Sequence, residues 1–92
     1  MVATIYTVDG EVKTVTPRNG TNFKLDELQE FVGGLVEIVP IEQSSKIMVV
    51  NEKGKLLGLP VNTRATDEWP TAYGPNDVIV GNALICEDEE VQ

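Results

Sequence analysis

The chain has 92 residues, of which 41% are hydrophobic and 24% charged, which suits one small domain and excludes two independently folding units. Fifteen acidic and seven basic residues give a formal charge of -8, which disfavours nucleic-acid binding, because that binding depends on cations that contact phosphates. Histidine is absent, which excludes Ser-His-Asp and Cys-His catalysis and histidine-ligated metals.

The first two elements are predicted to form a β-hairpin. Residues 2–8 and 11–16 are alternating segments rich in β-branched side chains, which is typical of strands. Asp9 and Gly10 lie between them and favour a tight two-residue turn. The amino-terminal segment lacks the basic residues and the apolar stretch of a signal peptide, so we expect no export.

An amphipathic helix is predicted next, over residues 24–32, where apolar side chains recur at helical spacing on one face. Asp26 and Glu27 fall in its first turn, where negative charge suits the positive end of the helix dipole. Gly33 and Gly34 follow, and glycine readily adopts the left-handed conformation that ends a helix.

The middle of the chain predicts an antiparallel meander. Residues 35–40 and 46–51 are apolar segments typical of strands, and residues 55–59 are expected to form a third short strand. Pro60 ends it, and residues 62–66 then suit one or two helical turns.

The last apolar segment, residues 78–86, belongs in the core, either as a bulged strand or as two short strands around a tight bend. Its acidic neighbours disfavour a reactive thiolate at Cys86, so we expect this single cysteine to be buried. Residues 87–92 form an acidic tail that is expected to fray. The tail holds four of the fifteen acidic residues, which leaves residues 1–86 with a net charge of -4.

Together these elements predict a single α+β domain over residues 1–86. We expect a small antiparallel or mixed sheet of about six strands with one amphipathic helix. The sequence also allows a second short helix. No segment approaches the roughly 18 to 20 apolar residues that a membrane span needs, so we expect a soluble cytoplasmic protein without membrane contact.

The candidate ligand site is an irregular segment near the carboxyl terminus that gathers an amide, a guanidinium group, hydroxyls and two large rings. Such groups can hold a phosphate, a base edge and a ring, and loops on a rigid sheet are common places for them. The candidate ligand-binding residues are Asn62, Arg64, Thr66, Trp69 and Tyr73.

A structural alternative for the same segment stays open. In it, Asn62 caps a short helix, Arg64 pairs with an acidic residue and Trp69 fills one end of the core. Gln29 and Glu37 are secondary candidates for ligand contact.

Two other polar clusters carry weaker signals. The carboxylates of Asp26, Glu27 and Glu30 suit a solvated helix face better than a metal site, so we expect neither a metal nor a cofactor. Residues 52–55 contain a Gly-Lys pair without the rest of a phosphate-binding loop, and we predict a hairpin turn there.

Four ordered segments resemble one protein family. They are LDELQEFVGGLVE at 25–37, MVVNEKGK at 48–55, LPVNTRAT at 59–66 and DVIVG at 77–81. From about Val8 to Glu87 the chain is similar to DUF3846, small domains without an agreed activity that are carried mainly by bacteria, phages and mobile elements. The resemblance implies a shared fold and, by association with phages, a counter-defence or host-takeover role.

Three classes of function are considered. The first is a non-enzymatic sponge that sequesters a small nucleotide-derived signal. In it, Arg64 binds the phosphate, and Trp69 or Tyr73 stacks on the base. Because a chain this short cannot easily surround such a ligand, this function implies a homo-oligomer with sites between subunits.

The second class of function is an acidic inhibitor or DNA mimic that binds a host nuclease or defence enzyme. The third is an enzyme, which we do not expect, because no specific catalytic constellation is recognisable.

Overall fold

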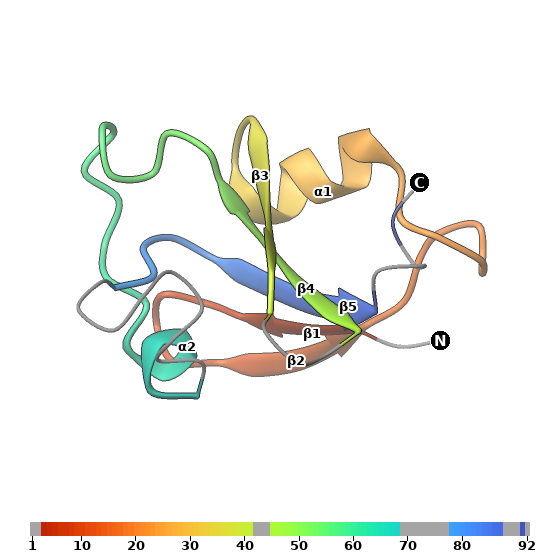
Figure 1. Ribbon diagram of the computed structural model, residues 1–92, viewed down its shortest axis with the longest axis horizontal. Coiled ribbons are helices and arrows are strands. Elements are labelled where there is room, and N and C mark those ends of the chain that lie inside the picture. Colours follow the sequence, from red (N-terminus) through yellow and green to blue (C-terminus); the bar gives the residue numbers. More distant parts are fainter. Residues whose placement is uncertain (1–2, 42–44, 69–77, 88–90, 92) are drawn as a thin grey trace.

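Five strands and two helices form the fold, with the helices on either side of the sheet (Figure 1). The computed structural model describes residues 3–41, 45–68, 78–87 and 91. The elements are β1 (Ala3–Tyr6), β2 (Val12–Val15), α1 (Leu25–Val32), β3 (Val36–Pro40), β4 (Lys46–Asn51), α2 (Thr63–Glu68) and β5 (Ala83–Glu87). The predicted α+β class is confirmed, with five strands in the described ranges where about six were expected.

The last strand of the chain lies at the centre of the sheet. The strand order is β2-β1-β5-β4-β3, and every pair of neighbouring strands is antiparallel. Ile85 of β5 is opposite Thr4 of β1 on one side and Met48 of β4 on the other. Strand β5 therefore joins the β1–β2 pair to the β3–β4 pair.

The neighbouring strands β4 and β5 are buried on both faces of the sheet. Val49 and Leu84 pack with α1 on one face, while Met48 and Ile85 pack with Ala65 of α2 on the other. Because successive side chains of a strand point to opposite faces, burial of both faces requires apolar residues at nearly every position. This explains the continuous apolar runs in β4 and β5.

The expected third strand of the meander, at residues 55–59, is wrong. Leu59 N–H donates to the Gly54 carbonyl at 3.0 Å, and Gly58 N–H donates to the Lys55 carbonyl at 3.2 Å. Gly58 has a φ of 69°, the left-handed conformation that ends a helical turn. The segment is therefore a capped turn that leads from β4 towards α2.

The first hairpin is confirmed, but its turn is longer than expected. Thr7 N–H donates to the Glu11 carbonyl at 2.9 Å, and Gly10 N–H donates to the Thr7 carbonyl at 3.1 Å. Gly10, with a φ of 93°, closes this loop of three residues in place of the expected two. The Thr7 hydroxyl also donates to the Asp9 carboxylate, which holds the pKa of Asp9 below its ordinary value.

Helix α1 ends at Gly33, as predicted, in a left-handed conformation with a φ of 79°. Two asparagine side chains bind the carbonyls of its last turn. Asn51 donates to the Val32 carbonyl at 3.1 Å, and Asn82 donates to the Phe31 carbonyl at 3.2 Å. These bonds fix the end of α1 to β4 and to the segment before β5.

The acidic face of α1 is less solvated than expected. Glu27 is only 4% exposed, and its carboxylate accepts the backbone N–H groups of Arg18 at 3.0 Å and Lys24 at 3.4 Å. The Arg18 guanidinium lies 3.9 Å from the Asp26 carboxylate and also pairs with Glu30. Arg18 thus neutralises part of the charge of this face.

The apolar segment 78–86 contains a tight bend, one of its two expected forms. Gly81 has a φ of 74°, Val80 before it makes an isolated bridge with Val61, and strand β5 begins after the bend. Cys86 is buried, as predicted.

The expected acidic tail, residues 87–92, is described at two positions. Glu87 is the last residue of β5, and Val91 bridges Phe23 and packs against the cluster under α1. Both residues therefore contact the folded domain.

Candidate functional site

Asn62, the first predicted site residue, is wholly buried, and both ends of its amide bind the chain. Its Nδ2 donates to the Tyr6 carbonyl at 2.8 Å and to the Gly81 carbonyl at 2.9 Å. Its Oδ1 accepts the Ala65 N–H at 3.0 Å, which confirms the alternative in which Asn62 caps a short helix. The amide joins β1, α2 and the bend before β5.

The other predicted residues divide into two groups. Thr66 is half-buried and its hydroxyl accepts the Ile79 N–H at 3.0 Å, whereas Arg64 is exposed on α2. Trp69 and Tyr73 lie outside the described residues. Asn62, Arg64 and Thr66 line neither of the two pockets presented below, so a ligand site in this segment stays a prediction.

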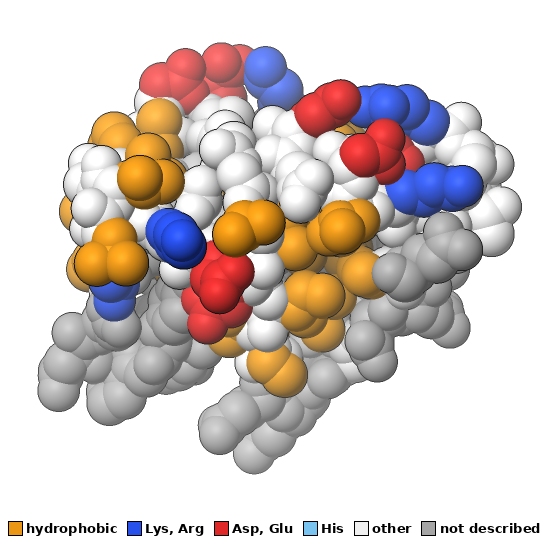
Figure 2. Space-filling view, turned by 90° about the horizontal axis from the view of Figure 1, so that it is seen from above, with side chains coloured by type: hydrophobic (Ala, Val, Ile, Leu, Met, Phe, Trp, Pro, Cys, Tyr) orange, Lys and Arg blue, Asp and Glu red, His pale blue; other side chains and the backbone are white. Residues whose placement is uncertain are grey.

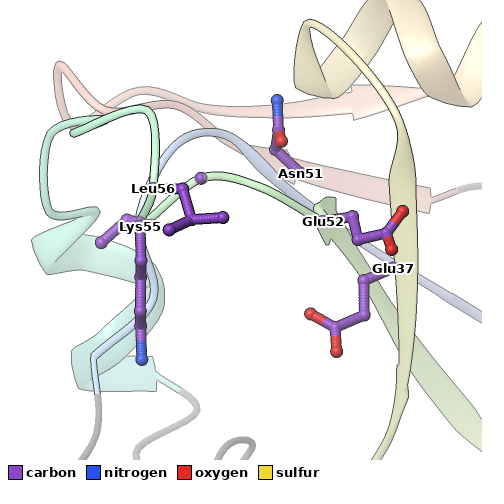
Figure 3. A pocket seen from close by; sticks show the side chains of 7 residues that line it. Glu37, Asn51, Glu52, Lys55 and Leu56 are labelled. Carbon is purple, nitrogen blue, oxygen red and sulfur yellow. The ribbon is translucent and has the colours of Figure 1, made fainter.

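A pocket of about 230 Å³ lies where β3, the end of β4 and the turn after β4 meet (Figure 3). We call it the β3–β4 pocket. Figure 3 shows Glu37 extending from β3 towards the turn, while Leu56 points into the opening from the turn. The lining residues are Glu37, Asn51, Glu52, Gly54, Lys55, Leu56 and Val80.

Two of these residues shape the β3–β4 pocket through contacts within the fold. A Cβ at Gly54 would lie 2.9 Å from Val80 Cγ2, so only glycine lets the turn pack this closely. The Asn51 side chain is buried and points towards α1, where it donates to the Val32 carbonyl; its Oδ1 accepts the Lys53 N–H at 2.8 Å. The other side chains that line the pocket are those of Glu37, Glu52, Lys55, Leu56 and Val80.

These side chains supply two carboxylates, one ammonium group and an apolar wall. Glu37 and Glu52 can accept hydrogen bonds from hydroxyl or amino groups, and Lys55 can bind an anionic group. Leu56 and Val80 offer apolar surface to a ring. The pocket thus suits a polar ring system that carries little negative charge.

An exposed hydrophobic patch borders this pocket. Leu56 is 87% exposed and Leu57 63%, both in the turn after β4, and Val61 follows at 49%. Figure 2 shows hydrophobic side chains gathered at this end of the molecule, with acidic and basic side chains beside them. Exposed apolar patches with a polar rim are characteristic of binding surfaces.

A second pocket, of about 350 Å³, lies between α2 and the sheet. It has the same charge balance, because its lining includes one cation, Lys46, and two carboxylates, Glu68 and Glu87. The Glu87 carboxylate also accepts a hydrogen bond from the Ser45 hydroxyl. Its lining residues are Thr4, Tyr6, Lys46, Glu68, Ile85, Cys86 and Glu87. Both pockets thus contain more acidic than basic groups.

Sequence reasoning identified only part of the β3–β4 pocket. Glu37 is a secondary candidate from the sequence, whereas residues 52–55 are predicted only as a hairpin turn. The structure has a turn there but, within the described residues 45–68, no strand directly after it, so the hairpin is wrong, and the turn places Glu52 and Lys55 at the pocket lining. The available signal was Leu56 next to Leu57, two large apolar residues that a solvated turn does not require.

The described part of the chain contains no group of three His, Cys, Asp or Glu side chains that could hold a metal ion. Within the same residues, neither helix combines the length and hydrophobicity needed to cross a bilayer.

The fold and pocket define a small α+β domain with a two-sided sheet and an open pocket beside one edge strand. The chain belongs to the DUF3846 family, a domain of unknown function, whose model matches residues 3–92. The match is longer than the resemblance over Val8 to Glu87 and covers every described element. No curated protein and no solved structure matches the chain.

Proposed function

We propose that the protein is a non-enzymatic binding protein that sequesters a small nucleotide-derived signal in the β3–β4 pocket. The observation that carries this proposal is the combination of Lys55, two carboxylates and an apolar wall in one open pocket. The ammonium group would hold a phosphate, the carboxylates would accept ribose hydroxyls or base amino groups, and Leu56 would cover one face of the base.

The charge of the pocket limits the class of nucleotide. Lys55 is the single cation among the described lining residues, and Glu37 and Glu52 repel additional negative charge. We therefore expect one phosphodiester or monophosphate group rather than a polyphosphate. The volume, about 230 Å³, lies below the roughly 300 to 1,000 Å³ of sites that enclose drug-sized ligands, so we expect one nucleoside unit per pocket.

The association with phages that the family resemblance implies would make the ligand a defence signal and the protein a counter-defence factor. Sequestration would then need no catalytic step. A homo-oligomer would serve this role by placing several pockets in one particle.

Replacing Lys55 with alanine is expected to weaken nucleotide binding at least tenfold, because the phosphate loses its charged partner. Isothermal titration calorimetry would measure this with nucleoside monophosphates and cyclic mono- and dinucleotides. Lys53→Ala is the matched control, since Lys53 belongs to the same turn, is exposed and does not line the pocket.

If none of these nucleotides binds the unaltered protein, the proposed function is wrong. If binding is lost in Arg64→Ala and retained in Lys55→Ala, the ligand lies at the segment predicted from the sequence, and the pocket assignment is wrong.

An acidic protein inhibitor is the second candidate function. The observation that favours it is the exposed leucine pair next to Glu52. A basic and apolar surface of a host enzyme would complement this combination. The acidic face of α1 is a weaker basis for DNA mimicry, because Arg18 pairs with Asp26 and Glu30.

For the inhibitor, the double variant Leu56→Ser, Leu57→Ser is expected to abolish inhibition of the target nuclease while preserving the fold. Inhibition assays against purified restriction and defence nucleases at two salt concentrations would measure it. The double variant Asp26→Asn, Glu30→Gln is the control, and a loss of inhibition in that variant alone would favour charge mimicry instead.

A further inference from the structure

Strand β3 forms one edge of the sheet, and its backbone register determines which groups point outwards. The Leu35 carbonyl accepts the Glu52 N–H at 2.8 Å, and the Ile41 N–H donates to the Lys46 carbonyl at 3.1 Å. In an antiparallel pair, residues alternate between those bonded to the neighbour and those that point away from it. The polar backbone groups of residues 36, 38 and 40 therefore point outwards.

The two edges of the sheet differ in how they are protected. On β2, Lys13 pairs with Glu11 at 3.4 Å, and both side chains are exposed. Charged side chains of this kind protect natural edge strands against pairing with other chains. Strand β3 also carries one charged residue, Glu37, but it has five residues against four in β2, and Ile38, whose backbone groups point outwards, is 45% exposed. Because short edge strands are themselves a protection against pairing, β3 is the more receptive edge.

We propose that β3 pairs antiparallel with β3 of a second copy of this chain, with Ile38 opposite Ile38 across a two-fold axis. Ile38 of each copy would exchange N–H and C=O hydrogen bonds with its counterpart. The Val36 N–H of each copy would donate to the Pro40 carbonyl of the other. Proline has no N–H, but its carbonyl is available at this position, so each of the two Val36–Pro40 pairs loses only its return bond.

The charge of Glu37 selects this register over its neighbours. With Ile38 on the axis, Glu37 lies opposite Val39 of the second copy. A register centred on residue 37 would place the two Glu37 carboxylates directly opposite each other, which is destabilising. Within residues 36–40, a register that pairs Ile38 with Pro40 would form two backbone hydrogen bonds, because Pro40 has no N–H, against four with Ile38 on the axis.

This pairing extends the sheet of one copy into that of the other. Ile38 lies on the face of the sheet that α1 covers, because it alternates with Glu37, which is opposite Val50 of the α2 face. The two Ile38 side chains, each 45% exposed in one copy, would cover each other at the axis. The inference supports the homo-oligomer in the proposed function but rests on strand register and not on any ligand.

The test uses the full chain without added nucleotide, measured by analytical ultracentrifugation at several protein concentrations. We expect the unaltered protein to be a dimer and Ile38→Lys to be a monomer with an unchanged circular dichroism spectrum. Val12→Lys is the matched control, because Val12 is 41% exposed on the other edge strand and should leave the dimer intact.

Cysteine cross-linking tests the register. Directly opposite, hydrogen-bonded residues have Cα atoms about 5.5 Å apart, which a disulfide can span. Ile38→Cys should therefore give a covalent dimer under mild oxidation, and Glu37→Cys should not; the buried Cys86 should leave the unaltered protein without a cross-link.

A monomeric unaltered protein, or a dimer that persists in Ile38→Lys, would overturn the interface. Cross-linking through residue 37 and not through residue 38 would overturn the register. These results are independent of nucleotide titrations, so failure of the interface and failure of the proposed function are distinguishable.

Discussion

Asn62→Asp is expected to destabilise the fold more than Asn62→Ala. The alanine variant leaves the Tyr6 and Gly81 carbonyls and the Ala65 N–H without their partner, which should cost about 3 kcal/mol. Aspartate keeps the helix-capping oxygen but turns a second oxygen towards two buried carbonyls. We expect it to cost at least about 1 kcal/mol more than alanine.

Urea denaturation at neutral pH, followed by circular dichroism, would measure both variants. Arg64→Ala is the control on the same helix, and its exposed side chain predicts a change within about 0.5 kcal/mol. An aspartate variant as stable as the alanine variant would show that the two donated hydrogen bonds contribute little, and that capping of α2 is the main role of Asn62.

Ending the chain at Asn82 is expected to abolish folding, because the truncation removes the whole of β5. Strands β1 and β4 each lose a neighbour, and both hydrophobic clusters lose their central side chains, among them Leu84 and Ile85. A small domain has only about 5 to 15 kcal/mol of stability, so a loss of this size leaves no folded population. The expected result is a circular dichroism signal without a cooperative urea transition.

A chain that ends at Glu87 is the control, because it keeps β5 and loses the four-residue acidic run except its first member. It should unfold cooperatively, with stability lower by about 1 to 2 kcal/mol because Val91 no longer packs against the core. A cooperative transition in the chain that ends at Asn82 would contradict the central role of β5.

The local elements were largely readable from the sequence because local patterns determine them. The helix was expected over 24–32 and occupies 25–32, with Gly33 at its end. The strand predicted at residues 55–59 is wrong because the leucines there suggest burial. A tight approach of Gly54 to distant Val80 instead holds the segment in a turn. That contact joins residues far apart in sequence, and local periodicity carries no information about it.

The order of the strands and the composition of the pocket depend on the same kind of distant contact. The apolar runs at 47–50 and 83–86 indicated core strands, but nothing in them specifies that β5 lies between β1 and β4. Asn62 was recognisable as a cap because capping is local. Glu37 and Lys55 meet at one pocket only once β3 and the turn are placed beside each other.

The central position of β5 has a kinetic consequence. Thr4 pairs with Ile85, so the sheet is completed only when the two ends of the domain meet, and folds dominated by such contacts form slowly. During synthesis β1 and β4 emerge before β5 exists, and each exposes an unprotected apolar edge until then. We expect the nascent domain to be prone to aggregation and to depend on chaperones more than its small size would suggest.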